Sequence, residues 1–174
     1  DVGETAAVAI SGVSGADATE SGSQSVTITI NDNESTPTIT LTVSATSIAE
    51  NAGSSLTLTA TSSIVSGSDI TVSLGTSSTA TEGTDYATVS DITISAGATT
   101  GTTTFTPTDD SMYETSTNET AIISIDGVSG GSATEDGTQS VTITITEDDS
   151  APTVTLTTSA TSIAENAGSS ITLT

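Results

Sequence analysis

The chain repeats itself with a period of 115 residues, and this repeat limits the folds that it can adopt. Residues 1–59 and 116–174 are identical at 40 of 59 positions without a gap, and residues 47–55 return unchanged at 162–170. Self-similarity at a fixed period is typical of a tandem array in which each period is one structural unit. We therefore expect successive copies of one domain.

The period divides the chain into three segments. Residues 1–34 match the C-terminal part of one repeat, residues 35–149 form a complete repeat, and residues 150–174 match the N-terminal part of the next. The two end segments together match only 59 of the 115 positions, so they do not supply one intact domain between them. We expect the chain to be part of a longer array.

The composition excludes several classes of function. The chain has 22 acidic residues and no Lys, Arg or His, which gives a formal net charge of -22. Nucleic-acid binding depends on Lys and Arg, so we expect no nucleic-acid partner. Without His or Cys the chain has no imidazole or thiolate for a zinc site or a Ser-His or Cys-His nucleophile. A carboxylate pair of the glycosidase type remains open, but near-identical tandem copies favour spacing or avidity over catalysis, and we expect no enzyme.

The absence of cysteine also bears on the compartment. An array without disulfides fits a secreted bacterial protein better than a small secreted animal domain, in which disulfides are usual. The longest apolar run, residues 6–10, is far shorter than the roughly 18 residues that a membrane span needs. We expect an extracellular or cell-surface location in bacteria and no membrane insertion of this segment.

Apolar residues alternate with Thr and Ser, which together number 71. Period-two alternation predicts half-buried strands, and Thr suits their outer face because its β-branch favours extended backbone. Seven strands are predicted in the complete repeat, at 39–43, 56–58, 70–74, 92–94, 102–106, 123–125 and 141–145, with turns at 51–53, 66–68, 82–84, 96–97 and 127–131. The pattern predicts an all-β fold: an immunoglobulin-like antiparallel β-sandwich of about seven strands per repeat, in a tandem array with a largely aliphatic core.

The acidic residues gather at turns. In the complete repeat they include Glu50 after the first strand, Asp85 in a Gly-Thr-Asp-Tyr turn, the loop 109–114, and the terminal run 147–149. Calcium takes six to eight oxygen ligands, and loops that meet at one end of a sandwich can supply them. A solvated acidic linker that keeps the array soluble is the simpler alternative.

The order of these motifs resembles that of the Calx-beta domain, a family found in sodium–calcium exchangers and in large bacterial surface adhesins. The resemblance covers residues 35–149 and rests on four motifs: Glu50-Asn51-Ala52-Gly53; Gly83-Thr84-Asp85-Tyr86; Asp109-Asp110 with Glu114 and Glu119; and a final strand that runs into Glu147-Asp148-Asp149. The resemblance implies a seven-stranded sandwich whose distal loops bind calcium ions near the junction with the next domain.

The resemblance also implies a set of ligands. In the complete repeat these are Glu50, Asp85, Asp109, Asp110, Met112 through its backbone carbonyl, Glu114, Glu119, Glu147, Asp148 and Asp149. For the preceding repeat the matching positions are Asp32 and Glu34 with Glu4, and for the following repeat Glu165.

Two functions follow as hypotheses. In the first, the chain is an extracellular calcium-binding structural repeat that stiffens and extends a cell-surface adhesin or filament, with calcium ions, neighbouring repeats and other copies as partners. In the second, each repeat binds a glycan or another cell-surface ligand, and repetition supplies avidity. Three aromatic residues in 174 offer little stacking surface for a sugar, which favours the first hypothesis.

Overall fold

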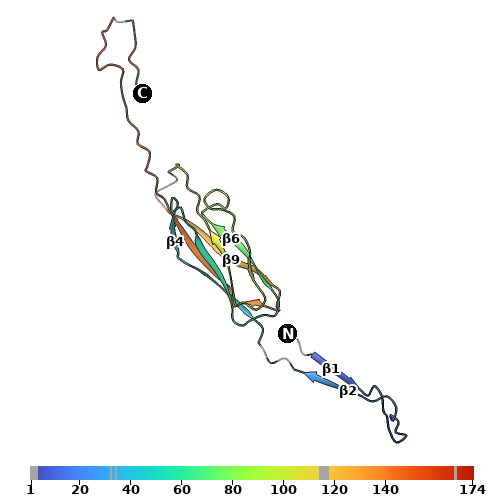
Figure 1. Ribbon diagram of the computed structural model, residues 1–174. Helices are drawn as coiled ribbons and strands as arrows, with labels where there is room; N and C mark the ends of the chain where they lie inside the picture. Colours follow the sequence, from blue (N-terminus) through green and yellow to red (C-terminus); the bar gives the residue numbers. More distant parts are fainter. Residues whose placement is uncertain (1–3, 32, 34, 114–117, 167) are drawn as a thin grey trace.

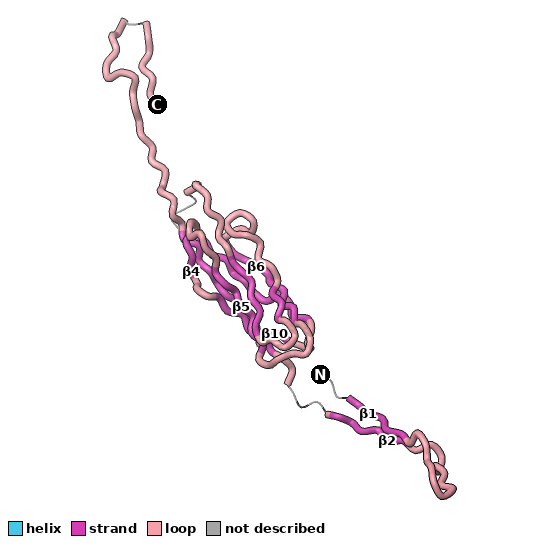
Figure 2. Tube along the Cα trace, viewed as in Figure 1, coloured by secondary structure: helices cyan, strands magenta, loops and turns pink. Residues whose placement is uncertain are grey.

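The computed structural model describes residues 4–31, 33, 35–113, 118–166 and 168–174. Figure 2 shows that this part of the chain consists of strands and loops. It contains no helix with the length and hydrophobicity that a membrane crossing requires. The strands of the described residues are β1 (Glu4–Ala9), β2 (Ser25–Ile30), β3 (Thr38–Val43), β4 (Ser47–Ala49), β5 (Leu56–Ser62), β6 (Ile70–Ser78), β7 (Ile92–Ile94), β8 (Thr100–Phe105), β9 (Glu119–Ser129), β10 (Thr134–Glu135) and β11 (Ser140–Thr146).

Strands β3 to β11 form a β-sandwich, which confirms the predicted fold (Figure 1). One sheet has the order β10-β3-β5-β8 and the other β4-β11-β9-β6-β7. All seven predicted strands are present as β3, β5, β6, β7, β8, β9 and β11. The two strands that were not predicted, β4 and β10, are short and pair in parallel, with β11 and β3 respectively.

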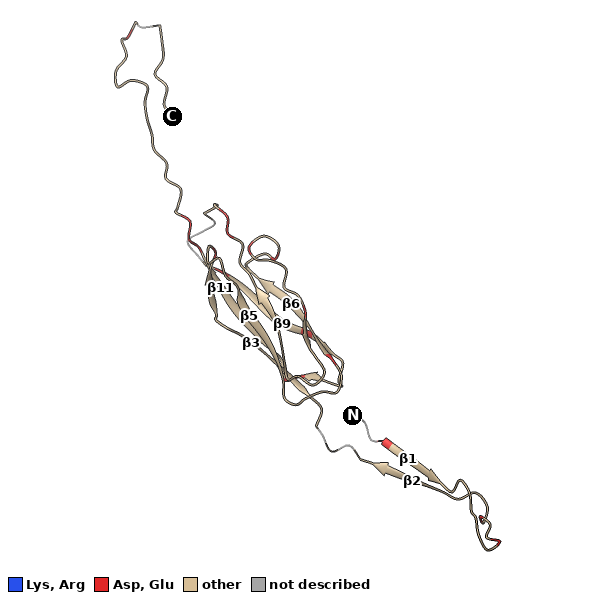
Figure 3. Ribbon diagram, in the orientation of Figure 1, with Lys and Arg blue, Asp and Glu red and all other residues tan. Residues whose placement is uncertain are grey.

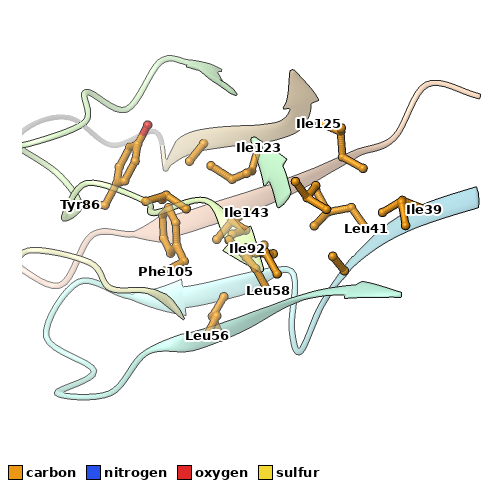
Figure 4. Packing of buried hydrophobic residues seen from close by; sticks show 14 of the residues in the cluster. Ile39, Leu41, Leu56, Leu58, Tyr86, Ile92, Phe105, Ile123, Ile125 and Ile143 are labelled. Carbon is orange, nitrogen blue, oxygen red and sulfur yellow. The ribbon is translucent and has the colours of Figure 1, made fainter. Parts of the chain in front are cut away.

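The alternating apolar residues form one core between the sheets (Figure 4). Ile39, Leu58 and Ile143 are fully buried, and the Thr residues between such positions face outward or lie half-buried. The core also contains Tyr86 and Phe105, whose rings stack with centroids 4.8 Å apart. Two of the three aromatic residues therefore pack inside the sandwich.

The turn predicted at 127–131 begins later than expected. β9 continues to Ser129, and Gly127 lies within it opposite Ser73. The next pair is Leu74 with Ile125, so Asp126 is the extra residue of a β-bulge. A glycine inside a strand often marks such a bulge, whereas the sequence alone suggested a turn.

The segments on either side of the sandwich use the same backbone pairings as their counterparts within it. In the hairpin β1–β2, Glu4 lies opposite Ile30 and Ala9 opposite Ser25, the register of β9–β11 shifted by 115 residues. Near the C-terminus, Thr158 bridges to Leu173, as Val43 pairs with Leu58 in the sandwich. Figure 1 shows that the hairpin and the C-terminal segment lie beyond opposite ends of the sandwich.

Candidate metal site at one end of the sandwich

Two carboxylates lie side by side because β4 and β11 run in parallel. Ile48 lies opposite Ile145 and Ala49 opposite Thr146, and the Glu50 N–H donates to the Thr146 carbonyl at 3.1 Å. Side chains alternate along a strand, so Glu50 follows the inward direction of Ile48. Its side chain is only 7% exposed. The pairing of two short segments therefore brings Glu50 to the end of β11, where Glu147 begins the linker.

Three carboxylates form a compact cluster at this end. Carboxylate oxygens of Glu50, Glu147 and Asp148 all lie within 4.8 Å of one another. The Asn51 side-chain amide donates to Asp148 Oδ2 at 2.5 Å, and Glu147 Oε1 accepts the Asp149 N–H at 2.8 Å. Figure 3 shows acidic segments at the end of the sandwich from which the chain leaves toward the C-terminus.

The donor set fits a calcium ion. Calcium binds oxygen at 2.3–2.6 Å, so two ligands of one ion lie no more than roughly 5 Å apart, and the 4.8 Å limit of the cluster satisfies this condition. Two carboxylates about 4 Å apart repel by roughly 1 kcal/mol even at the dielectric constant of water. The chain has no cationic side chain to offset this repulsion. Three carboxylates leave further positions for backbone carbonyls, water or other acids.

A second acidic group faces the same linker. Asp110 Oδ1 accepts the Met112 N–H at 2.6 Å, which folds the loop after β8 into a tight turn. Burial raises the pKa of Asp149, and the negative charges of Asp148, Glu147, Asp110 and Asp109 raise it further. Asp109 and Asp110 therefore lie close enough to Asp149 to raise its pKa. The loop after β8 and the linker share one acidic region.

Asp85 holds the chain in place just before that loop. Its side chain is buried, and its Oδ2 accepts the Thr81 N–H at 2.5 Å. Its backbone carbonyl accepts the Thr108 N–H at 2.9 Å. Asp85 thus fixes the start of the segment that leads to Asp109, but its carboxylate is not part of the three-carboxylate cluster described above.

The remaining predicted ligands are not members of this three-carboxylate cluster or lie outside the described residues. Glu119 is the first residue of β9 and lies opposite Ile145, two residues before Glu147. Met112 is exposed in the loop after β8, and Glu4 and Glu165 are exposed in the flanking segments. Asp32, Glu34 and Glu114 lie outside the described residues. Ligation by any of these residues stays a prediction.

Sequence reasoning placed Asn51 in a turn and in the first motif but gave it no role at the site, although its side-chain amide donates to Asp148. Three other acids have structural roles, because each accepts a backbone N–H: Asp69 from Ala96 at 2.7 Å, Glu82 from Val89 at 3.0 Å, and Asp91 from Leu74 at 3.0 Å.

The raised pKa of Asp149 predicts an unusual pH dependence. In the folded chain the pKa lies above 3.8, so ionised Asp149 opposes folding at neutral pH, and this opposition is lost as pH falls through the raised pKa. In EDTA we therefore expect the melting temperature to rise as the pH falls from neutrality toward the raised pKa of Asp149. Asp149→Asn should raise the melting temperature at neutral pH and flatten this rise. A melting temperature that falls steadily as the pH is lowered in EDTA would contradict the raised pKa of Asp149.

Comparison with known proteins supports the fold. No family model matches the chain, and no curated protein matches it. A crystal structure of the apo form of the Calx CBD1 domain has a TM-score of 0.52 and 19% identity, over 64% of this chain and 99% of that one. A crystal structure of CBD12 from CALX1.2 has a TM-score of 0.50 and 20% identity, over 59% of this chain and 42% of that one. The sandwich is therefore of the kind seen in Calx domains.

Proposed function

We propose that this chain is a calcium-binding structural repeat that stiffens and extends an extracellular adhesin or filament. The observation that carries the proposal is the cluster of Glu50, Glu147 and Asp148, whose carboxylate oxygens lie within 4.8 Å of one another in a chain without a cationic side chain. The likeness of the fold to Calx domains and the Calx-beta order of the sequence motifs support it.

The position of the cluster explains how an ion would change stiffness. Glu50 belongs to the body of the sandwich, because it directly follows β4. Glu147 and Asp148 begin the linker that leads to residues 150–174, which we propose to be the start of the next repeat. An ion bound by all three would tie the linker to the sandwich. It would also remove the repulsion that otherwise drives the linker away from the body.

The proposed location follows from the same chemistry. Extracellular calcium modules bind with dissociation constants of about 0.1–1 mM, so they are loaded by the calcium outside cells. A chain with no cysteine needs no oxidising step to fold, and this suits a bacterial surface protein. We propose that the chain acts there, with calcium ions and neighbouring repeats as its partners.

Small-angle X-ray scattering across a calcium titration tests the proposal. We expect calcium to narrow the distribution of maximum dimensions and raise the apparent stiffness, and EDTA to reverse both. Calorimetric titration on the same samples should give saturable binding in the submillimolar to millimolar range. Magnesium at equal ionic strength is the control for screening. Identical scattering in calcium and in EDTA would contradict the stiffening role, even if calcium binds.

The alternative, a repeated glycan-binding module, has less support. Sugar sites commonly use exposed aromatic rings, but Tyr86 and Phe105 are buried against each other in the core. Tyr113, in the loop after β8, is the remaining aromatic residue and is half-buried. A glycan array that gives a saturable signal in EDTA would favour this alternative over the structural role.

A further inference from the structure

Three neighbouring strands of one sheet have only threonine on their outer face. In β3, β5 and β8 the inward positions include core residues such as Leu41, Leu58 and Phe105, and the residues between them face outward. These outward residues, which we call the threonine face, are Thr38, Thr40 and Thr42 in β3, Thr57, Thr59 and Thr61 in β5, and Thr100, Thr102 and Thr104 in β8. Thr59 lies opposite Thr42 on one side and Thr102 on the other, so the side chains form one continuous array.

The threonine face is uncharged in a chain whose formal net charge is -22. β3, β5 and β8 contain no acidic residue. Glu135, in β10 at the edge of the same sheet, lies opposite the buried Ile39 and so follows its inward direction. The other sheet, by contrast, has the exposed Asp126 in the bulge of β9. Because the chain has no cationic side chain, acids of two copies repel each other, and this face lets a second copy approach without meeting an acid.

Two hydroxyl groups of the threonine face already have acceptors within the sheet. Thr40 Oγ1 donates to the Thr61 carbonyl at 3.5 Å, and Thr42 Oγ1 donates to the Thr59 carbonyl at 3.4 Å. Burying a hydroxyl that has no partner is unfavourable, so these long hydrogen bonds lower the cost of removing water from the face. The threonine methyl groups supply apolar area that gains from burial.

The internal repeat keeps the threonine face. The five positions of the face that recur in the next copy are again threonine: Thr153, Thr155, Thr157, Thr172 and Thr174. The outward residues Ile122 and Ser124 of β9, in the other sheet, correspond instead to Ala7 and Ala9. Strands accept Val, Ile, Tyr and Phe as well as Thr, so the fold alone does not require threonine at each of these positions.

We propose that two copies of this chain stack side by side through their threonine faces. Neighbouring strands of a sheet are rotated by roughly 20–25° relative to each other, so the face is twisted. Two twisted sheets pack face to face with their strands about 30° apart, whereas a flat crystalline surface would touch only part of the array. The same patch on both copies makes the contact isologous. The contact joins neighbouring chains laterally, and it does not depend on the proposed calcium site.

Sedimentation velocity in EDTA tests the contact without calcium. Sodium chloride screens the acids, so it should strengthen the association, and in high salt the weight-average mass should rise with concentration up to the millimolar range. Thr102→Glu places a charge at an exposed position of the threonine face and should weaken association by about tenfold or more. Thr142→Glu makes the same change at an exposed residue of β11 in the other sheet and should leave association unchanged. A natural chain that stays monomeric would overturn the proposal, as would two variants that associate equally, because other surfaces would then be responsible.

NMR spectroscopy of the natural chain locates the contact without relying on the folding of a variant. In EDTA and high salt, we expect the methyl signals of Thr40, Thr59 and Thr102 to shift as the chain concentration rises, while that of Thr142 stays fixed. Cellohexaose, added to a dilute sample, serves as a soluble glycan probe and should leave all four signals in place. Signals of the threonine face that respond to cellohexaose but not to chain concentration would overturn the proposal and assign the face to glycan binding.

Discussion

Replacing Phe105 with alanine is expected to destabilise the sandwich by about 3–5 kcal/mol, because the change removes a large buried side chain and leaves a cavity. Phe105 is fully buried at the end of β8, and its ring stacks on Tyr86 at a centroid distance of 4.8 Å. A domain of this size has a total stability of only about 5–15 kcal/mol. Chemical denaturation in calcium and in EDTA, followed by circular dichroism, measures the loss.

The matched control is Val65→Ala, because Val65 is exposed and its truncation removes no core contact. We expect that variant to stay within about 0.5 kcal/mol of the natural chain. The loss in Phe105→Ala should be similar with and without calcium, since Phe105 lies in the core and offers no ligand oxygen. A loss below about 1 kcal/mol would contradict the packing described for this part of the core.

Most of the fold follows from local sequence pattern. Strands such as β3 and β9 have several apolar residues at every second position, so their type and their inward face can be predicted. β4 could not be predicted, because Ser47-Ile48-Ala49 contains one large apolar residue and no alternation. It exists through pairing with β11, which lies almost 100 residues later in the chain.

The candidate site could be predicted only in part, because its geometry also depends on the pairing of β4 with β11. Glu50, Glu147 and Asp148 were each candidates from the family resemblance, and the structure brings these three together. Their contact depends on the parallel register of β4 with β11, which no local pattern encodes. Asp85 was also a candidate; its carboxylate accepts the Thr81 N–H, and its ligation stays a prediction.

Glu50→Gln is expected to change the stability of the sandwich in opposite directions with and without calcium. Glutamine keeps the shape of the side chain and one acceptor oxygen but removes a negative charge from the buried position beside Glu147 and Asp148. In EDTA the variant should be more stable than the natural chain, because one source of repulsion is gone. In calcium it should be less stable, because a charged ligand of the ion is lost.

The expected size follows from linkage between binding and folding. A calcium concentration of 100 times the dissociation constant stabilises the folded chain by about 2.7 kcal/mol, and a tenfold weaker site recovers only about half of that. Thermal melts of the natural chain and of Glu50→Gln, each in calcium and in EDTA, give the four melting temperatures that the comparison needs. Asp126→Asn is the matched control, because it also removes one charge, from an exposed residue of the β9 bulge. If Glu50→Gln and Asp126→Asn responded alike to calcium, Glu50 would not be a ligand. The stiffening proposed for the junction would then need another source.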